Sequence, residues 1–313
     1  MKRWIALAIS LAICTGCAMA FAQRKPGPNT EPKTVQVGNL TRTYLLHVSP
    51  SLPPDKPCPL VFVFHGGGGN GQVTERLTQF SPVADREGFI AVYPDGIGKN
   101  WNDGREPYVS PSHRDNVDDV GFVSAMIDAV SQTHAIDPKR IFATGISNGA
   151  IFSHYVGAKL STRFAAIAPV VGGIAEPFAP QFKPDEPVSV FILQGTDDPL
   201  DPYHGGGVAG GRRGHIIDTD KTVELWTRQD GCATTPQTGE LPDSDPSDAC
   251  RVKWSTWSKG RNGTEVTLYT IEGGGHTWPG GSQFLPKFIV GRVCHDFDAT
   301  QAIWEFFTKH PKP

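Results

Sequence analysis

The chain has 313 residues, of which 38% are hydrophobic and 19% charged, so it is long enough to bury a large core and too apolar to be disordered as a whole. Its formal net charge is −3. This balance argues against a nucleic-acid partner, because phosphate backbones require a clustered basic surface. Nothing in the middle of the chain resembles a linker, so we expect one large domain at residues 35–313, preceded by an extended tail at residues 23–34.

The first 22 residues have the features of a secretory signal peptide. A basic start is followed by a short apolar run and by small residues that allow cleavage after Ala20 or, as we prefer, after Ala22. Cys17 opens a lipoprotein alternative, which Cys14 disfavours because such signals carry an aliphatic residue at that position. No later segment is long and apolar enough to cross a bilayer. We therefore expect a secreted protein, extracellular or periplasmic, with no membrane span.

Four cysteines remain after such cleavage, and an even number suits disulfide bonding in an oxidising compartment: Cys58, Cys232, Cys250 and Cys294. Three pairings are open. Closeness in sequence favours Cys232 with Cys250, which leaves Cys58 with Cys294. Four free thiols would instead fit a reducing compartment.

Apolar runs predict strands and helices in turn along the chain. Two runs flanking Gly38-Asn39-Leu40 predict an edge hairpin, and five continuous runs are typical of buried strands: 60–64, 89–93, 141–143, 165–168 and 188–193. Helices are expected at 117–134, at 150–160, from Asp218 onward, and around 303–307 at the end. Two further strands, 251–258 and 266–271, flank the turn Asn262-Gly263.

Strands that alternate with helices predict an α/β fold with a mostly parallel central sheet and helices on both faces. In such sheets, ligand sites form outside the carboxyl ends of the strands. Each motif described below directly follows a predicted strand. We therefore expect these motifs to share one site.

Ser147 is the candidate nucleophile. It lies in Gly145-Ile146-Ser147-Asn148-Gly149, which fits Gly-x-Ser-x-Gly and follows the strand at 141–143. Small residues two before and two after the serine let the strand and the following helix approach each other in a tight turn. The serine would then lie at a helix N-terminus, whose free N–H groups and positive dipole end stabilise a developing oxyanion.

A serine nucleophile needs a histidine base and a carboxylate that orients the base. Asp198 follows the strand at 188–193 and is the preferred acid, with Asp197 and Asp201 as rivals in the same turn. His276 is the preferred base, because it lies in a glycine-rich loop directly after the strand at 266–271. Three other histidines are rivals, of which the first would instead hold the glycine loop by hydrogen bonds: His65, His204 and His215.

The glycine run that follows His65 lets bare backbone N–H groups point at a ligand. We expect the N–H groups of Gly67 and Asn148 to form an oxyanion hole. No Lys-Ser/Thr pair follows the run, so a nucleotide-binding loop is disfavoured. The acidic run at 243–248 lacks the glycine and the distal glutamate of a calcium loop. The expected chemistry needs no metal and no cofactor.

Together these motifs resemble the secreted polyhydroxybutyrate depolymerase and feruloyl esterase family of α/β-hydrolases, from about Val35 to the closing helix. The resemblance rests on Phe64-His65-Gly66, Trp101-Asn102, Asp119-Val120-Gly121-Phe122, the serine motif, Gly195-Thr196-Asp197-Asp198-Pro199 with Pro202-Tyr203, and Gly275-His276-Thr277-Trp278-Pro279-Gly280-Gly281. The chain order Ser147, Asp198, His276 is that of α/β-hydrolases. The resemblance implies that these three residues form the triad.

By the same resemblance, Trp101 and Trp278 line the substrate cleft, with ordinary packing as the alternative. The chain departs from the family pattern in Gln194, where a histidine is common. It also has a pure glycine run where depolymerases often carry a cysteine, which weakens the depolymerase assignment and leaves the esterase assignment intact.

The resemblance implies a secreted serine esterase that acts through an acyl-enzyme on feruloylated plant polysaccharide or related acyl esters. A short-chain polyhydroxyalkanoate depolymerase is the nearest alternative. A serine peptidase of the same fold and a non-catalytic binding module are the others.

Overall fold

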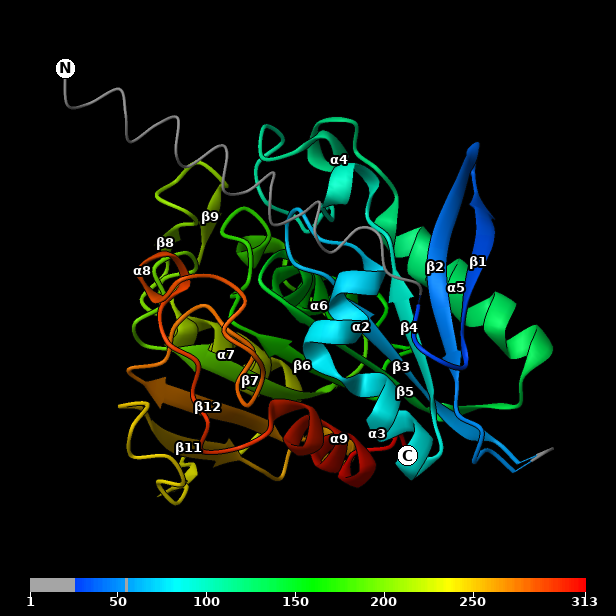
Figure 1. Ribbon diagram of the computed structural model, residues 1–313. Helices are drawn as coiled ribbons and strands as arrows, with labels where there is room; N and C mark the ends of the chain where they lie inside the picture. The colour runs from blue at the N-terminus through cyan, green and yellow to red at the C-terminus, as the bar shows by residue number, and fades with distance from the viewer. Residues whose placement is uncertain (1–25, 54–55) are drawn as a thin grey trace.

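One ten-stranded sheet runs through the molecule, and its six central strands are parallel (Figure 1). The computed structural model describes residues 26–53 and 56–313, so the predicted signal peptide and the first residues of the tail lie outside the described part. In spatial order the strands are β1 (Thr30–Val37), β2 (Leu40–Val48), β4 (Ile90–Pro94), β3 (Cys58–Phe64), β5 (Ile136–Ile146), β6 (Ala166–Val170), β7 (Ser189–Gly195), β12 (Val266–Glu272), β11 (Arg251–Trp257) and β10 (Gln237–Glu240). Two short strands, β8 (Gly206–Gly207) and β9 (His215–Ile216), form a separate ribbon.

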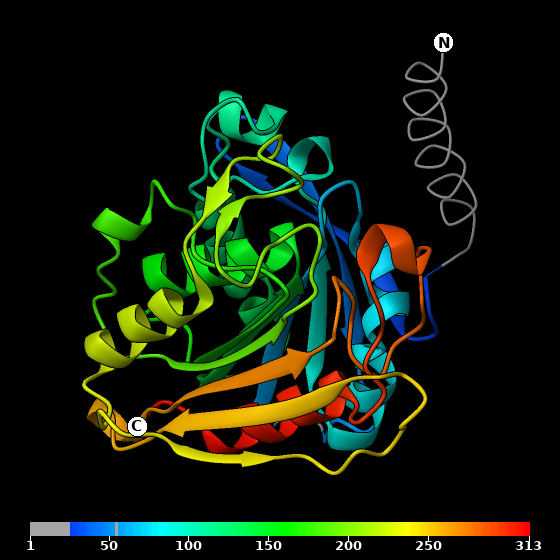
Figure 2. The ribbon, with the colours of Figure 1, turned by 90° about the vertical axis from the view of Figure 1, so that its left-hand side faces the viewer.

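Helices cover both faces of the sheet, as the alternation of strands and helices predicts. One face packs against α5 (Asp119–Thr133), α6 (Asn148–Lys159) and α7 (Thr219–Asp230) in a single apolar cluster. The other face packs against α3 (Phe80–Glu87) and α9 (Ala299–Lys309), with α2 (Gly71–Thr78) beside them. In Figures 1 and 2, the red α9 lies on the side of the sheet opposite the green α6. The described part of the chain also contains two single-turn helices, α4 (Pro111–Arg114) and α8 (Lys287–Val290).

The predicted strands are confirmed, and the N-terminal one is longer than expected. β1 begins at Thr30, so the last residues of the predicted tail belong to the sheet and pair antiparallel with β2. Pro32 argues against a strand here, because proline has no backbone N–H to donate. β1 lies at the edge of the sheet, however, where a residue without an N–H is tolerated.

The helices α2 and α3 carry no strong signal in the sequence. The buried side of α2 is mainly polar, with Thr74, Glu75 and Thr78 facing the interior. The carboxylate of Glu75 accepts hydrogen bonds from Thr30 and Ser81, so this helix is held to the sheet by buried polar contacts rather than by an apolar stripe. A search for apolar periodicity cannot detect such a helix.

Parallel pairing places the candidate motifs at one edge of the sheet. β5, β6, β7 and β12 are successive neighbours, and each pair among them is parallel. Ser147 follows the carboxyl end of β5, Asp198 follows that of β7 and His276 follows that of β12. Residues from three distant parts of the sequence therefore meet above the same edge.

The predicted cysteine pairs are wrong. Cys250 directly precedes β11, whereas Cys232 packs against Gly260, beyond the other end of that strand. Seven residues of strand separate the two ends by roughly 23 Å, and a disulfide requires Cα atoms within about 7 Å of each other. Cys58 begins β3, while Cys294 accepts a hydrogen bond from Gly280 beyond the carboxyl ends of the strands. Closeness in sequence does not predict the pairing here, because the chain between residues 232 and 250 places these two cysteines at opposite ends of β11.

Across the described residues, no helix combines the length and the apolar character needed to span a bilayer.

Candidate active site

Ser147 lies at a strained turn between β5 and α6. Its backbone has φ 58° and ψ −123°, a conformation that a residue with a side chain rarely adopts. The turn is held by hydrogen bonds from the N–H of Ser147 to Val170 and from Ala150 and Ile151 to the carbonyl of Ser147. Ser147 is half-buried, and its strained backbone is that expected for a nucleophile elbow.

The two flanking glycines are required by direct backbone contact. A Cβ on Gly145 would lie 2.6 Å from the carbonyl oxygen of Gly149, and a Cβ on Gly149 would lie 2.3 Å from that of Phe64. Neither backbone atom can move aside without displacing the start of α6 or the end of β3. The predicted reason for the Gly-x-Ser-x-Gly spacing is therefore confirmed.

His276 and Asp198 form the buried pair that the sequence predicts. Nδ1 of His276 lies 2.8 Å from Oδ2 of Asp198, and the two side chains are 6% and 0% exposed. The other carboxylate oxygen, Oδ1, accepts hydrogen bonds from the N–H groups of Leu200 and Asp201, both at 2.8 Å. The acid is thus fixed by its own turn, and one oxygen is left to orient the imidazole.

The charges around His276 favour its protonated form. Burial alone would lower the pKa of His276, but the charge and hydrogen bond of Asp198 and the charge of Asp201 outweigh burial and raise this pKa to about 9. Asp201 is fully buried, its carboxylate lies 4.0 Å from Nδ1 of His276, and neither of its oxygens has a hydrogen-bond partner among the described residues. Burial and the neighbouring charge of Asp198 raise the pKa of Asp201 to about 7, against the opposing charges of His276 and Arg105.

The rival residues contact other groups. Asp197 is exposed and accepts a hydrogen bond from Thr196, while His204 is exposed and His215 pairs with Glu106. His65 is buried, which lowers its pKa to about 4. Its Nδ1 donates to the carbonyl of Gly66 and its Nε2 accepts from the N–H of Gly96, so it ties the glycine loop to the next loop, as expected.

The glycine loop after β3 packs directly on the serine turn. A Cβ on Gly66 would lie 3.4 Å from Cβ of Ser147, and a Cβ on Gly67 would lie 3.8 Å from Cβ of Asn148. Within the described part of the chain, the N–H groups of Gly67 and Asn148 have no hydrogen-bond partner. These two donors therefore remain available to a ligand beside Ser147.

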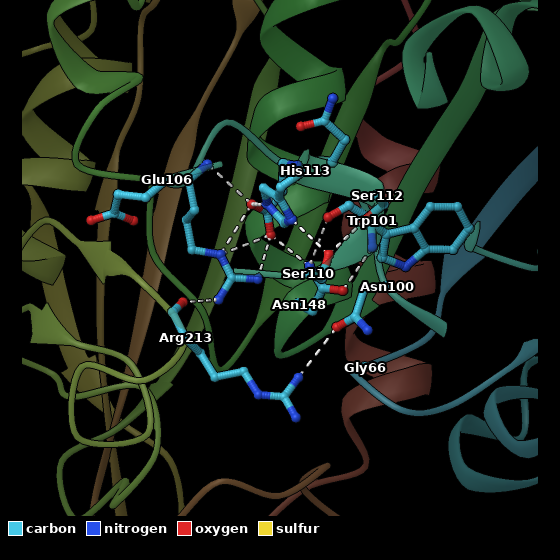
Figure 3. Close-up of polar contacts among 12 residues, drawn as sticks. Gly66, Asn100, Trp101, Glu106, Ser110, Ser112, His113, Asn148 and Arg213 are labelled. Atoms are coloured by element: carbon cyan, nitrogen blue, oxygen red, sulfur yellow. Dashed lines mark hydrogen bonds and ion pairs between the residues drawn. The ribbon is translucent and has the colours of Figure 1, made fainter. Parts of the chain in front are cut away.

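A buried polar network fixes the side chain of Asn148 (Figure 3). Its Oδ1 accepts from the N–H of Trp101 at 2.9 Å, and its Nδ2 donates to Asp103 at 2.5 Å. Asp103 is fully buried and also accepts hydrogen bonds from Arg105 and from His113, which in turn contacts Ser110. Burial alone would raise the pKa of Asp103, but Arg105 and His113 together lower it to about 2. The first residue of α6 is thereby anchored to a permanently charged group.

The prediction that Trp101 and Trp278 line the substrate cleft is wrong. Trp101 is 0% exposed, stacks on Phe152 with ring centroids 5.0 Å apart, and donates its indole N–H to the carbonyl of His65. Trp278 is 1% exposed and donates to Thr300 on α9. Both side chains pack beneath the loops that carry the site. The alternative of ordinary packing is therefore the correct one.

Sequence reasoning missed the cluster of Asp103, Arg105 and His113 and the position of Arg213. The guanidinium of Arg213 lies over the glycine loop, where its Nη1 is 3.3 Å from Oδ1 of Asn100 (Figure 3). No periodicity or motif signals these residues, because the contacts that gather them, such as Asp103 with Asn148 and Arg105 with Arg213, join distant parts of the chain. The Gly-Gly-Arg-Arg-Gly stretch that contains Arg213 signals only a loop.

The predicted triad is assembled only in part. The acid and base are in contact, whereas no hydrogen bond between Ser147 and His276 is recorded among the described residues. Catalytic hydrogen bonds are often long in a structure without substrate.

Comparison with known proteins places this arrangement in a family. Residues 43–177 match the family model described as Esterase PHB depolymerase. NocK of Nocardia uniformis subsp. tsuyamanensis, a protein assigned as an esterase, is 31% identical over 295 residues, which cover 91% of this chain and 85% of NocK. Feruloyl esterase B of Piromyces equi is 30% identical over 230 residues, which cover 71% of this chain and 40% of that enzyme.

A more distant sequence relative and a solved structure are also similar to this chain. Poly(3-hydroxyalkanoate) depolymerase C of Paucimonas lemoignei is 26% identical over 255 residues, covering 74% of this chain and 58% of that enzyme. The solved acetyl xylan esterase from Aspergillus awamori superimposes with a TM-score of 0.54 at 14% identity, covering 79% of this chain and 94% of that one. With its serine elbow, its parallel sheet and a relative similar over nearly the whole length, this chain belongs to the Esterase PHB depolymerase family and is a serine esterase of the α/β-hydrolase fold.

Proposed function

We propose that the protein is an exported esterase that cleaves feruloylated saccharides or related acyl esters, with Ser147, His276 and Asp198 as its triad. The observation that carries the triad is the buried contact between His276 and Asp198, at the same edge of the sheet as a serine held in the elbow conformation. The basic and apolar start of the sequence supports export. The names of relatives such as feruloyl esterase B support the substrate class.

The mechanism follows from the donors and acceptors around Ser147. His276 takes the proton of the Ser147 hydroxyl, and the oxygen attacks the ester carbonyl to form a tetrahedral intermediate. The N–H groups of Gly67 and Asn148 bind the negative oxygen of that intermediate. His276 then returns the proton to the leaving alcohol. Water attacks the acyl-enzyme by the same steps and releases the acid.

A substrate panel tests this proposal. The protein is expected to release product in a burst from p-nitrophenyl esters, to react covalently with a fluorophosphonate at Ser147, and to hydrolyse methyl ferulate faster than a peptide anilide. A folded protein that shows neither burst nor covalent capture would contradict the esterase mechanism. A protein that turns over the anilide faster would favour the peptidase alternative.

Arg213 favours a second substrate class, the short hydroxyalkanoate oligomers that end in a free carboxylate. Its carbonyl accepts a hydrogen bond from the buried Arg105 at 2.7 Å, so the base of the side chain is fixed. Its Nη1 lies 3.2 Å from the Cβ position of Gly67, beside the proposed oxyanion hole. Among the described residues, no carboxylate forms an ion pair with it. A guanidinium beside the proposed oxyanion hole without a counter-ion suits a substrate carboxylate two carbons from the ester oxygen.

The prediction is that Arg213→Gln lowers the preference for the charged substrate. The measured quantity is the ratio of kcat/KM for the 3-hydroxybutyrate dimer acid to kcat/KM for its methyl ester. This ratio should fall about tenfold in Arg213→Gln, which corresponds to one charge-assisted contact of about 1.4 kcal/mol. Arg212→Gln is the matched control, because both arginines are exposed in the same loop and the described contacts place only Arg213 at Gly67. Equal ratios in both variants would remove the case for this substrate class.

The charges around His276 predict an alkaline pH profile. Only neutral imidazole can accept the serine proton, and the pKa of His276 is raised to about 9, so kcat/KM should rise with pH up to about 9. Asp201→Asn removes a negative charge 4.0 Å from Nδ1 and should lower the pKa of His276 by roughly one to three units. The acidic limb of the profile should therefore move to lower pH. The check is kcat/KM for a neutral p-nitrophenyl ester from pH 5 to pH 10.

Asp197→Asn is the control for this shift, because Asp197 is exposed and lies in the same turn. This variant should leave the apparent pKa of the acidic limb within a few tenths of a unit of the parent value. If the acidic limb lay at the same pH in both variants as in the parent protein, the charge of Asp201 would not raise the pKa of His276.

A further inference from the structure

Two cysteines meet behind the loop that carries His276. Cys250 directly precedes β11 and Cys294 follows α8, and each is 1% exposed within a small apolar cluster with Val252 and Ile271. Their Sγ atoms and a carboxylate oxygen of Asp248 all lie within 4.8 Å of one another. The other cysteines of the described chain, Cys58 and Cys232, lie at β3 and beyond the far end of β11.

The segment that ends in Cys294 is hydrogen-bonded along the histidine loop. The N–H of His276 donates to the carbonyl of Val290, and the N–H of Gly275 donates to that of Arg292. The N–H of Gly280 donates to the carbonyl of Cys294 itself at 2.8 Å. The position of the base therefore depends on where the segment 290–294 is held.

Asp248 links the two segments that carry the cysteines by hydrogen bonds. One of its carboxylate oxygens accepts from the N–H of Cys250 at 2.7 Å and the other from the N–H of His295 at 2.6 Å. The thiols are therefore held side by side by backbone contacts that do not involve sulfur. Such preorganisation favours a bond between them.

We propose that Cys250 and Cys294 form a disulfide bond that clamps the His276 loop onto the start of β11. This inference rests on the proposed export, because disulfides form in oxidising compartments. Each thiol gives up its proton and one electron as the S–S bond forms. The two electrons reduce the disulfide of an oxidant of the thiol–disulfide oxidoreductase class, which leaves as a dithiol.

A metal site fits the same residues less well. Structural zinc takes four ligands, and only three ligand atoms converge here among the described residues. Both oxygens of Asp248 already accept backbone hydrogen bonds. The hydrogen bond with Cys250 and burial raise the pKa of the Cys294 thiol, which opposes the thiolate that a metal requires.

The crosslink would close the chain around β11, β12 and the histidine loop, so its loss should affect both stability and activity. Within the described residues, reduction leaves the segment 290–294 tied to the start of β11 only by the hydrogen bonds of Asp248. The backbone support that holds His276 against Asp198 is then weaker. Cys232 lies outside this arrangement, so Cys232→Ser provides a matched control.

The first test counts thiols in the full chain exported from cells with its own leader. The mature protein is denatured and alkylated without reductant, and its mass and tryptic map are measured. Two alkylated cysteines, Cys58 and Cys232, and one crosslinked peptide pair containing residues 250 and 294 are expected. Four alkylated cysteines, with or without bound zinc in elemental analysis, would overturn the proposal, as would any other pairing.

The second test asks what the bond does. Cys250→Ser, Cys294→Ser and the double variant should each lower the melting temperature and lower kcat/KM for a neutral p-nitrophenyl ester about tenfold, whereas Cys232→Ser should not. Dithiothreitol should reproduce the loss in the parent protein and have no further effect on the double variant. A reduced parent protein with full activity would refute the clamp. The thiol count does not depend on turnover, so a crosslinked protein without esterase activity would count against the proposed function alone.

Discussion

Ser147→Ala is expected to lower kcat for p-nitrophenyl esters by about 10⁶-fold, to near the rate that oxyanion donors alone provide. Alanine keeps the backbone and the Cβ, so the strained turn at φ 58° is no worse for alanine than for serine. The loss is therefore purely that of the nucleophilic oxygen. Steady-state kinetics, together with the absence of fluorophosphonate capture, would measure it.

Ser153→Ala is a suitable control, because Ser153 is a buried serine on the same helix. Its hydroxyl only donates to the carbonyl of Gly149. This variant should keep kcat within about threefold of the parent, with a stability loss of about 1 kcal/mol from the missing hydrogen bond. A Ser147→Ala protein that folds normally and keeps more than a hundredth of the activity would mean that another residue is the nucleophile.

The parts of this protein that could be predicted from sequence are those set by local pattern. Continuous apolar runs identified the buried strands, because both faces of a parallel sheet are covered. The serine turn could be predicted because Gly-x-Ser-x-Gly is a local pattern, although the backbone contacts that require its glycines include Phe64 on β3 as well as Gly149. His276 and Asp198 could be predicted because each follows a parallel strand, and the carboxyl ends of parallel strands lie at the same edge of the sheet as Ser147.

The parts that could not be predicted depend on contacts between distant segments. A tryptophan beside a motif can face a cleft or pack beneath it, and nothing local to Trp101 shows that Phe152 will stack on it. The Asp103 network joins the loop at residues 103–105 to α4 and to the start of α6, and Asp103, Arg105 and His113 carry no motif in the sequence. The cysteine pairing failed for the same reason, because the fold brings Cys250 to a residue 44 positions away.

Asp198→Asn is expected to lower kcat by about 10⁴-fold while leaving the fold intact. Asparagine has the shape of aspartate, so Oδ1 can still accept from the N–H groups of Leu200 and Asp201. Its amide N–H₂ would then face Nδ1 of His276, which favours the tautomer with the proton on Nε2 and leaves no lone pair for the serine proton. The measurement is kcat for a neutral ester near pH 9, with circular dichroism as the check on folding.

Asp201 makes the size of this loss informative. Its carboxylate is the second acid within 4.0 Å of Nδ1, and with Asp198 neutral it is the one negative charge that can still support a protonated imidazole. If Asp201 takes over part of that role, Asp198→Asn should lose less than the double variant Asp198→Asn with Asp201→Asn. Asp201→Asn alone should mainly shift the pH profile. Equal losses in the single Asp198 variant and the double variant would show that only the acid in hydrogen-bond contact orients His276, since orientation requires a directed bond and charge alone does not supply one.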